Sequence, residues 1–529
     1  MAATAQVELV GPGAAESLYT RFLDTLTHFG RERVALEDIR QPHYSYGELL
    51  KITLALGRLV SKITAPDEHV GVLMPNLAST VGLVLGMNAF RRVPAMLNYT
   101  AGMQNLLDAC TAAQVKTVVT SRQFLETAEL EQQAAGLGEQ VRLVYLEDMR
   151  AGFGWLDKAW LAGYAMLFPA RAASPGNADA QAVVLFTSGS EGRPKGVVLS
   201  NRALLANVDQ ICAAIDFSAD EKFFNALPIF HSFGLTAGVL LPLLTGVSSM
   251  LYTTPLHYRQ IPEMIRARGS TVLFGTSTFF ANYAKFAAAE DFRSLRIVVA
   301  GAEKLTEPVR ETWRSKFGIE LIEGYGATET APVLAVNPLT DIRPGSVGRL
   351  LPGVDARVVP IPGIRSGGVL HVRGPNLMLG YYRVENPGVL EPPASEVGSG
   401  WYNTGDVVEI DHDGFVRIVG RVKRFAKVAG EMISLETVEA IAAQAAPDFQ
   451  HGAATTQDEQ RGEAIVLFTT AQGLSRELLL EAARTMGLPE IAVPRRLEYI
   501  ETLPVLATGK VDHVSLQALA RGMQAAACS

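Results

Sequence analysis

The chain has 529 residues, of which 48% are apolar, and a formal net charge of -7. This length is sufficient for roughly three to four domain-sized units, and the acidic charge argues against nucleic acid as a partner. The three cysteines, Cys110, Cys212 and Cys528, are far apart in the sequence. Their spacing excludes a disulfide scaffold and a cysteine zinc site, and it predicts a reducing, cytoplasmic location.

Two segments bear on membrane association. The first thirty residues contain no basic stretch followed by an apolar core, so no secretory signal is expected. The run 232–256 has no charged residue and is long enough for a membrane-spanning helix, but glycines and prolines interrupt it. We therefore expect a buried helix, a turn at 245–246 and a buried strand over 247–252. The composition leaves open peripheral contact with the inner face of the cell membrane.

The first third of the chain alternates helices and strands. Apolar spacing predicts helices over 44–62, capped by Ser45, and over 76–90. Short apolar runs predict strands over 70–74, 93–97, 117–120 and 141–146. This βαβ rhythm indicates a parallel sheet. Residues 149–180 are the least regular stretch and are expected on the surface.

A glycine-rich loop follows, between two short apolar strands at 183–186 and 197–199. Its order T-S-G-S-x-G-x-P-K-G combines glycines, hydroxyls and one lysine, which suits a phosphate chain. It is not a Walker A loop, because a strand and not a helix follows the lysine. Glu191 is unsuited to a phosphate site, because its carboxylate would repel phosphate unless it points away.

Further strands are expected over 271–274, 295–300 and 320–323, each ending in a loop of small residues. In open α/β sheets, ligands bind outside such carboxyl ends. From about residue 344 the pattern becomes that of short strands and hairpins, and the last hundred residues predict a small α+β unit. We therefore expect an α/β protein. Its large N-terminal domain, 1–421, has parallel-sheet layers and a β-rich subdomain over 344–420, and a small mobile C-terminal domain follows over 422–529.

Six motifs occur in one order along the chain: 187–196, 227–234, 325–330, 402–406, Gly420-Arg421 and Gly509-Lys510. Together they resemble the adenylate-forming superfamily of acyl-CoA synthetases, luciferases and adenylation domains. Segments 92–102, 255–259, 272–279 and 423–432 look like the acyl-ACP synthetase half of the bifunctional 2-acylglycerophosphoethanolamine acyltransferase/acyl-ACP synthetases. No H-x-x-x-x-D acyltransferase motif is present, so a free-standing synthetase is expected.

The resemblance implies ATP and Mg²⁺ as cofactors, and it implies a role for each motif. Lys510 and His231 would act in catalysis, and Glu329 would act in catalysis and hold the metal. Lys423 would be the hinge. The residues expected to bind the nucleotide are Thr187, Ser188, Gly189, Ser190, Gly192, Lys195, Gly301, Ala302, Glu303, Tyr325, Gly326, Thr328, Asp406 and Arg421. The residues expected to line the acyl pocket are Phe230, His231, Phe233, Gly275, Thr276 and Phe279.

The implied reaction is activation of a fatty acid to an acyl-adenylate, followed by transfer to the thiol of acyl carrier protein. The cations Arg421, Lys423, Arg424 and Lys427 would meet that acidic partner, because complementary charge steers encounter. Two alternatives remain open: a fatty acyl-CoA synthetase, and a non-catalytic acyl-binding relic. The presence of Lys195, Glu329, Asp406 and Lys510 argues against the relic.

Overall fold

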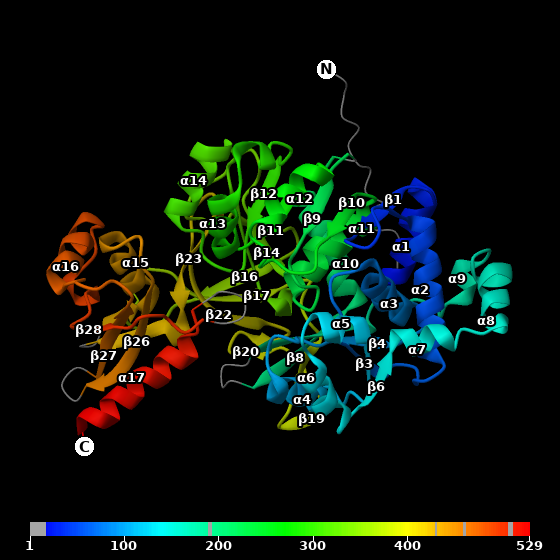
Figure 1. The fold of residues 1–529 in the computed structure, drawn as a ribbon. Coiled ribbons are helices and arrows are strands. Elements are labelled where there is room, and N and C mark those ends of the chain that lie inside the picture. The colour runs from blue at the N-terminus through cyan, green and yellow to red at the C-terminus, as the bar shows by residue number, and fades with distance from the viewer. Residues whose placement is uncertain are drawn as a thin grey trace. The chain divides into compact units, whose positions relative to one another are not determined.

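The computed structural model describes residues 17–188, 193–218, 220–364, 366–428, 431–458, 462–505 and 511–528. The chain divides into two compact units. The first contains Met1–Asp355 and Arg373–Tyr402, and the second contains Ala356–Val372 and Asn403–Ser529. Figure 1 shows the elements of both units.

The first unit is built on two large sheets. One sheet has the order β15-β14-β13-β12-β11-β9-β10-β1-β2, and its strands from β1 through β10, β9, β11 and β12 to β13 pair in parallel. Its strands are β1 (Val34–Glu37), β2 (Tyr44–Ser45), β9 (Lys222–Asn225), β10 (Ser248–Leu251), β11 (Val272–Gly275), β12 (Ile297–Ala300), β13 (Ile322–Gly326), β14 (Val333–Val336) and β15 (Arg349–Leu350). The three strands expected between 271 and 323 are β11, β12 and β13.

The other sheet has the order β19-β18-β8-β7-β4-β3-β5-β6. Its strands are β3 (His69–Val72), β4 (Val93–Met96), β5 (Thr117–Thr120), β6 (Arg142–Tyr145), β7 (Gln181–Ser188), β8 (Pro194–Ser200), β18 (Gly380–Arg383) and β19 (Asn386–Glu391). Pairing is parallel from β6 to β7 and antiparallel from β7 to β19. The βαβ pattern of the sequence is thus confirmed, and the phosphate-loop strands join the sheet that it predicted.

Helices surround these sheets (Figure 1). They are α1 (Leu18–Phe29), α2 (Tyr46–Ser61), α3 (Ala78–Ala89), α4 (Met103–Ala112), α5 (Arg122–Thr127), α6 (Glu131–Gly138), α7 (Leu146–Ala151), α8 (Trp155–Trp160), α9 (Pro169–Ala172), α10 (Asn201–Ala214), α11 (Leu241–Thr245), α12 (Gln260–Arg268), α13 (Ser277–Phe286) and α14 (Glu307–Phe317). Helix α2 begins after Ser45, whose side chain and that of Glu48 form a capping box. Residues 149–180 were expected to be irregular, yet they include α8 and α9 joined by the π-helix η1 (Leu161–Ala165).

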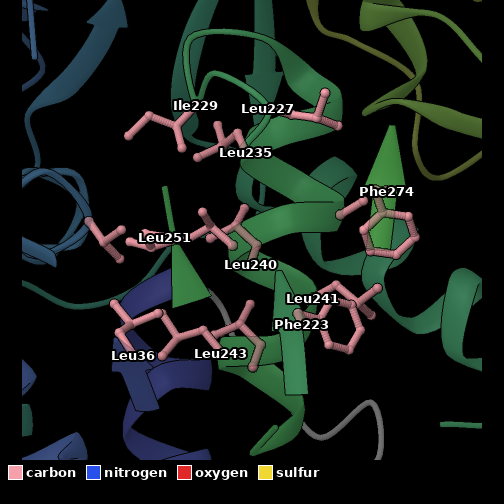
Figure 2. Packing of buried hydrophobic residues seen from close by; sticks show 14 of the residues in the cluster. Leu36, Phe223, Leu227, Ile229, Leu235, Leu240, Leu241, Leu243, Leu251 and Phe274 are labelled. Atoms are coloured by element: carbon pink, nitrogen blue, oxygen red, sulfur yellow. The ribbon is translucent and has the colours of Figure 1, made fainter. Parts of the chain in front are cut away.

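The uncharged run 232–256 is buried in the first unit. It forms the π-helix η2 (Phe233–Leu240), α11, a left-handed turn at Gly246 and strand β10, as the sequence predicts. Figure 2 shows its leucines among side chains from the neighbouring strands, including Leu36, Phe223 and Phe274. Among the residues that the structure describes, no helix is long and apolar enough to cross a membrane.

The second unit contains two smaller sheets. One has the order β16 (Asp355–Val359), β17 (Gly368–Arg373), β22 (Tyr402–Ile410) and β23 (Val416–Arg421). The other has β25 (Glu431–Ser434), β24 (Phe425–Val428), β27 (Gly462–Thr469) and β26 (His451–Asp458), with β28 (Arg496–Tyr499) paired to β27. Its helices are α15 (Leu435–Ala445), α16 (Arg476–Thr485) and α17 (His513–Cys528).

The overall α/β class, with a large unit followed by a smaller one, is confirmed. The strands expected in the β-rich stretch form, but β16, β17, β22 and β23 group mainly with the C-terminal residues. The boundary at 421/422 and the hinge at Lys423 stay predictions.

Candidate functional site

The predicted phosphate loop joins β7 and β8 in an antiparallel hairpin. Thr187 lies opposite Lys195, and Ser188 lies opposite Pro194. The loop residues Gly189, Ser190, Glu191 and Gly192 lie outside the described residues. Of the expected phosphate ligands, the structure therefore fixes the backbone of Thr187, Ser188 and Lys195 at the end of the hairpin.

Arg193 anchors this hairpin to helix α4. Its guanidinium pairs with both carboxylate oxygens of Asp108, with Nε–Oδ2 at 2.9 Å and Nη2–Oδ1 at 3.1 Å. This bidentate pairing lowers the pKa of the Asp108 carboxyl. No local sequence signal indicates this contact, because the two residues are far apart in the chain.

Tyr381 links the lysine of the hairpin to Glu329. It lies on β18 opposite Val197 of β8, and its hydroxyl donates a 2.7 Å hydrogen bond to Glu329 Oε1. Lys195 Nζ lies 5.1 Å from the centroid of the Tyr381 ring, within range of a cation–π contact. One tyrosine thus contacts both the expected phosphate-binding cation and the expected metal-binding carboxylate. Sequence reasoning missed Tyr381.

Tyr402 extends this cluster through a side-chain hydrogen bond with Tyr381. Burial first, and then the negative charge of Glu329, raises the pKa of Tyr381 far above the usual value. Burial and Glu329 raise the pKa of Tyr402 in the same way. Both phenols therefore keep their protons at neutral pH, and Tyr381 remains a hydrogen-bond donor to Glu329.

The motif 325–330 begins at the end of β13 and continues into the 3₁₀ turn η4 (Thr328–Thr330). Tyr325 is buried, and Thr328 Oγ1 lies 3.3 Å from Ser232 Oγ. A Cβ on Gly326 would lie 2.0 Å from the carbonyl oxygen of Pro332. Backbone packing alone therefore requires glycine at position 326.

A buried ion pair supports the start of this motif. Arg310 on α14 pairs with Glu323 of β13, and it also contacts Glu320 and Glu307. Burial raises the pKa of Glu323, against the lowering effect of Arg310. Glu323 also accepts a hydrogen bond from the backbone N–H of Gly345 at 3.1 Å. These contacts fix β13 two residues before Tyr325.

Several residues expected at the acyl pocket lie in one aromatic region. Phe230 is buried and packs against Tyr99 and His231, with ring centroids 4.9 Å and 4.7 Å away. Phe233 packs against Phe274 at 5.7 Å. A Cβ added to Gly301 would lie 3.2 Å from the Phe233 ring, which brings the expected adenine and acyl segments together.

Other residues expected at the site have contacts that stabilise local structure. The side chain of Thr276 caps α13 by accepting a hydrogen bond from the backbone N–H of Phe279. The carboxylate of Glu303 accepts hydrogen bonds from Thr278 N at 2.6 Å and Thr278 Oγ1 at 3.0 Å, so it also lies at the start of α13. A Cβ on Gly275 would lie 2.7 Å from the Phe280 ring. Ala302 is exposed and has a φ of 66°.

The second unit holds the expected ribose-binding pair. Asp406 and Arg421 lie opposite each other on β22 and β23, with Arg421 Nε 2.9 Å from Asp406 Oδ1. Asp406 is buried, whereas Arg421 is largely exposed. The sequence expectation that Arg421 assists Asp406 is therefore consistent with their direct contact.

Of the cations that follow β23, one differs from the expectation that they meet an acidic partner at the surface. Lys423 is exposed on η5 (Val422–Arg424), and Lys427 is exposed on β24. The side chain of Arg424 is only 13% exposed, pairs with Glu439 at 2.7 Å and contacts His513. The expectation that Arg424 offers surface charge to a partner is therefore wrong. Lys510 lies outside the described residues.

Comparison with known proteins identifies similar chains. A family model described as AMP-binding enzyme matches residues 24–382. The long-chain-fatty-acid–CoA ligase of Salmonella typhimurium is 32% identical over 365 residues, which cover 65% of this chain and 63% of that ligase. The ligase of the same name from Escherichia coli O157:H7 is 33% identical over 362 residues, 64% of this chain and 62% of the ligase. The match therefore spans less than two thirds of these relatives.

The fold is similar over nearly the whole chain to a solved structure. The ATP-bound MatB of Rhodopseudomonas palustris superposes with a TM-score of 0.81 and 26% identity, covering 96% of this chain and 99% of MatB.

Proposed function

The chain belongs to the AMP-binding enzyme family, and we propose that it uses ATP to activate a fatty acid and transfers the acyl group to a thiol. The observation that carries this proposal is the contact of Tyr381 with both Lys195 and Glu329. A lysine and a carboxylate that contact the same tyrosine suit the binding of a phosphate chain and its metal ion. The two long-chain-fatty-acid–CoA ligases support a fatty acid as the substrate.

In the first half-reaction, a carboxylate oxygen of the fatty acid attacks the α-phosphorus of ATP. The bond from that phosphorus to the bridging oxygen breaks, and pyrophosphate leaves. Lys195 neutralises charge on the departing phosphates, and the hydroxyls of the hairpin donate hydrogen bonds to them. Tyr325 stacks on adenine, Asp406 accepts the ribose hydroxyls, and Lys510 donates to the α-phosphate, as the family resemblance implies.

Glu329 fits a magnesium site. Mg²⁺ takes one or two carboxylates and completes its shell with phosphate and water. Within the described parts of the chain there is no group of three or more His, Cys, Asp or Glu side chains that could hold a metal ion. The ion would therefore depend on Glu329 and on substrate phosphates, whose charge it would neutralise. Tyr381 holds Oε1 of that carboxylate in position.

In the second half-reaction, a thiol attacks the carbonyl carbon of the acyl-adenylate and AMP leaves. We propose coenzyme A as the thiol, because the relatives named above are CoA ligases. The segments that resemble acyl-ACP synthetases keep acyl carrier protein as the second candidate. The relatives support coenzyme A better than the carrier protein expected from the sequence.

The test is to incubate the protein with ATP, Mg²⁺ and palmitate, and then with either coenzyme A or holo-acyl carrier protein. We expect pyrophosphate release that requires palmitate, and palmitoyl-CoA as the thioester product. Glu329→Gln should abolish pyrophosphate release. Thioester formed only on carrier protein would refute the choice of coenzyme A. Absence of pyrophosphate with both acceptors would refute fatty-acid activation and favour the acyl-binding relic.

A further inference from the structure

Large apolar side chains gather on the surface of the segment formed by α8, η1 and α9. Trp155 is 75% exposed, Leu156 62% and Leu167 64%. Tyr164 and Phe168 are also exposed. Figure 1 shows α8 and α9 beside α2, at the margin of the view. Grouped exposed apolar side chains of this size indicate an interaction surface, whereas single ones do not.

The inner face of this segment is held firmly. Asp157, Leu161 and Ala165 recur every four residues and are buried. The Asp157 carboxylate pairs with Arg58 at 2.8 Å and Lys62 at 2.5 Å. Because the buried face is fixed by these contacts, the outer apolar side chains cannot turn into the core.

The surface of the segment is basic, although the whole chain is acidic. Between residues 151 and 177 the only acidic residue is Asp157, which is buried and paired. Lys158 and Arg171 are exposed among the apolar side chains, and Arg171 lies 5.8 Å from the Phe168 ring centroid. We call this set of exposed residues the 155–171 patch: Trp155, Leu156, Lys158, Tyr164, Leu167, Phe168 and Arg171.

We propose that the 155–171 patch docks this protein on an anionic lipid bilayer. Tryptophan and tyrosine favour the membrane–water interface, leucine and phenylalanine insert below it, and basic side chains are attracted to anionic headgroups. All three classes are exposed here within one short segment whose inner face is held by Asp157. The binding itself does not depend on the proposed function, but that function gives it a purpose, because long-chain fatty acids partition into bilayers.

The test is flotation of the whole protein with vesicles of phosphatidylcholine alone or with one quarter phosphatidylglycerol. We expect binding to the anionic vesicles that weakens as salt is raised, and a blue shift of tryptophan emission on binding. Trp155→Ser/Leu167→Ser should lower the partition coefficient about tenfold or more, because two inserting side chains are lost. Lys158→Glu/Arg171→Glu should lower binding to anionic vesicles and remove the salt dependence.

The matched control is Ile39→Ser/Val389→Ser, since these side chains are 51% and 48% exposed outside the patch. It should bind like the unaltered protein. Equal binding by control and patch variants would overturn the proposal, as would absence of binding by the unaltered protein. A dimer in solution that Trp155→Ser/Leu167→Ser dissociates would assign the patch to a second copy of the chain instead. Pyrophosphate release measured with dispersed fatty acid distinguishes loss of docking from failure of the proposed activity.

Discussion

Removal of one hydroxyl, in Tyr381→Phe, tests the cluster at the candidate site. The substitution keeps the ring near Lys195 and deletes the hydroxyl's 2.7 Å hydrogen bond to Glu329 Oε1 together with its hydrogen bond with Tyr402. A hydrogen bond to a charged group contributes about 1.5–3 kcal/mol. A loss of about 2 kcal/mol corresponds to about a 30-fold decrease in kcat/KM for ATP.

The assay is palmitate-dependent pyrophosphate release at varied ATP and Mg²⁺. Because Glu329 is the proposed metal-binding carboxylate, the variant should also need a higher Mg²⁺ concentration for half-maximal rate. A merely structural tyrosine would not shift that Mg²⁺ requirement.

Tyr382, the next residue on β18, offers a matched control. Successive side chains of a strand point to opposite faces, and the hydroxyl of Tyr382 accepts a 2.9 Å hydrogen bond from Gln181 Nε2. Tyr382→Phe should lower the free energy of unfolding by about 1 kcal/mol and leave kcat/KM for ATP unchanged. If Tyr381→Phe stays within about twofold of the unaltered protein, or if both variants lose activity equally, the assigned role of Tyr381 is refuted.

Three further predictions concern a buried ion pair, a histidine of the second unit and two glycines. Arg310→Met should lower the free energy of unfolding by about 3–5 kcal/mol in urea denaturation, because it leaves Glu323 buried without its cation. Adding Glu323→Gln should restore part of that loss, and a double variant with no restored stability would contradict the pairing of the two residues. Burial and then Arg424 lower the pKa of His513 to about 4, so the second unit should lose stability as pH falls from about 6.5 toward 4. In the unaltered protein the slope should stay below the ~1.4 kcal/mol per pH unit of one full proton, because the His513 side chain is 39% exposed. His513→Asn should flatten this pH dependence in thermal unfolding, and an unchanged slope in the variant would assign the titration to another group. Gly326→Ala should destabilise the protein more than Gly301→Ala in thermal unfolding. The added Cβ would lie 2.0 Å from a backbone oxygen at position 326, but 3.2 Å from a movable aromatic ring at position 301. Equal losses of stability would contradict the packing argument.

Local sequence patterns predicted most of the secondary structure. The strand over 117–120 has the expected bounds, and Ser45 caps α2 as expected. These features depend on side-chain periodicity and capping, which act over a few residues. The helices within 149–180 were not predicted, because local periodicity carries no information on distant contacts. Helix α8 is fixed by the pairing of Asp157 with Arg58 and Lys62, which are far from it in the sequence.

The sequence by itself determined the α/β class, the order of the motifs and the candidate groups for binding phosphate, metal and ribose. Those properties depend on residue types and on their spacing along the chain. Only the tertiary structure decided which of these groups share a partner. Tyr381 reaches Glu329 because β18 pairs with β8, and Arg424 is largely withdrawn from solvent, where it pairs with Glu439. Such contacts depend on how distant strands and helices pack, and local pattern carries no signal for them.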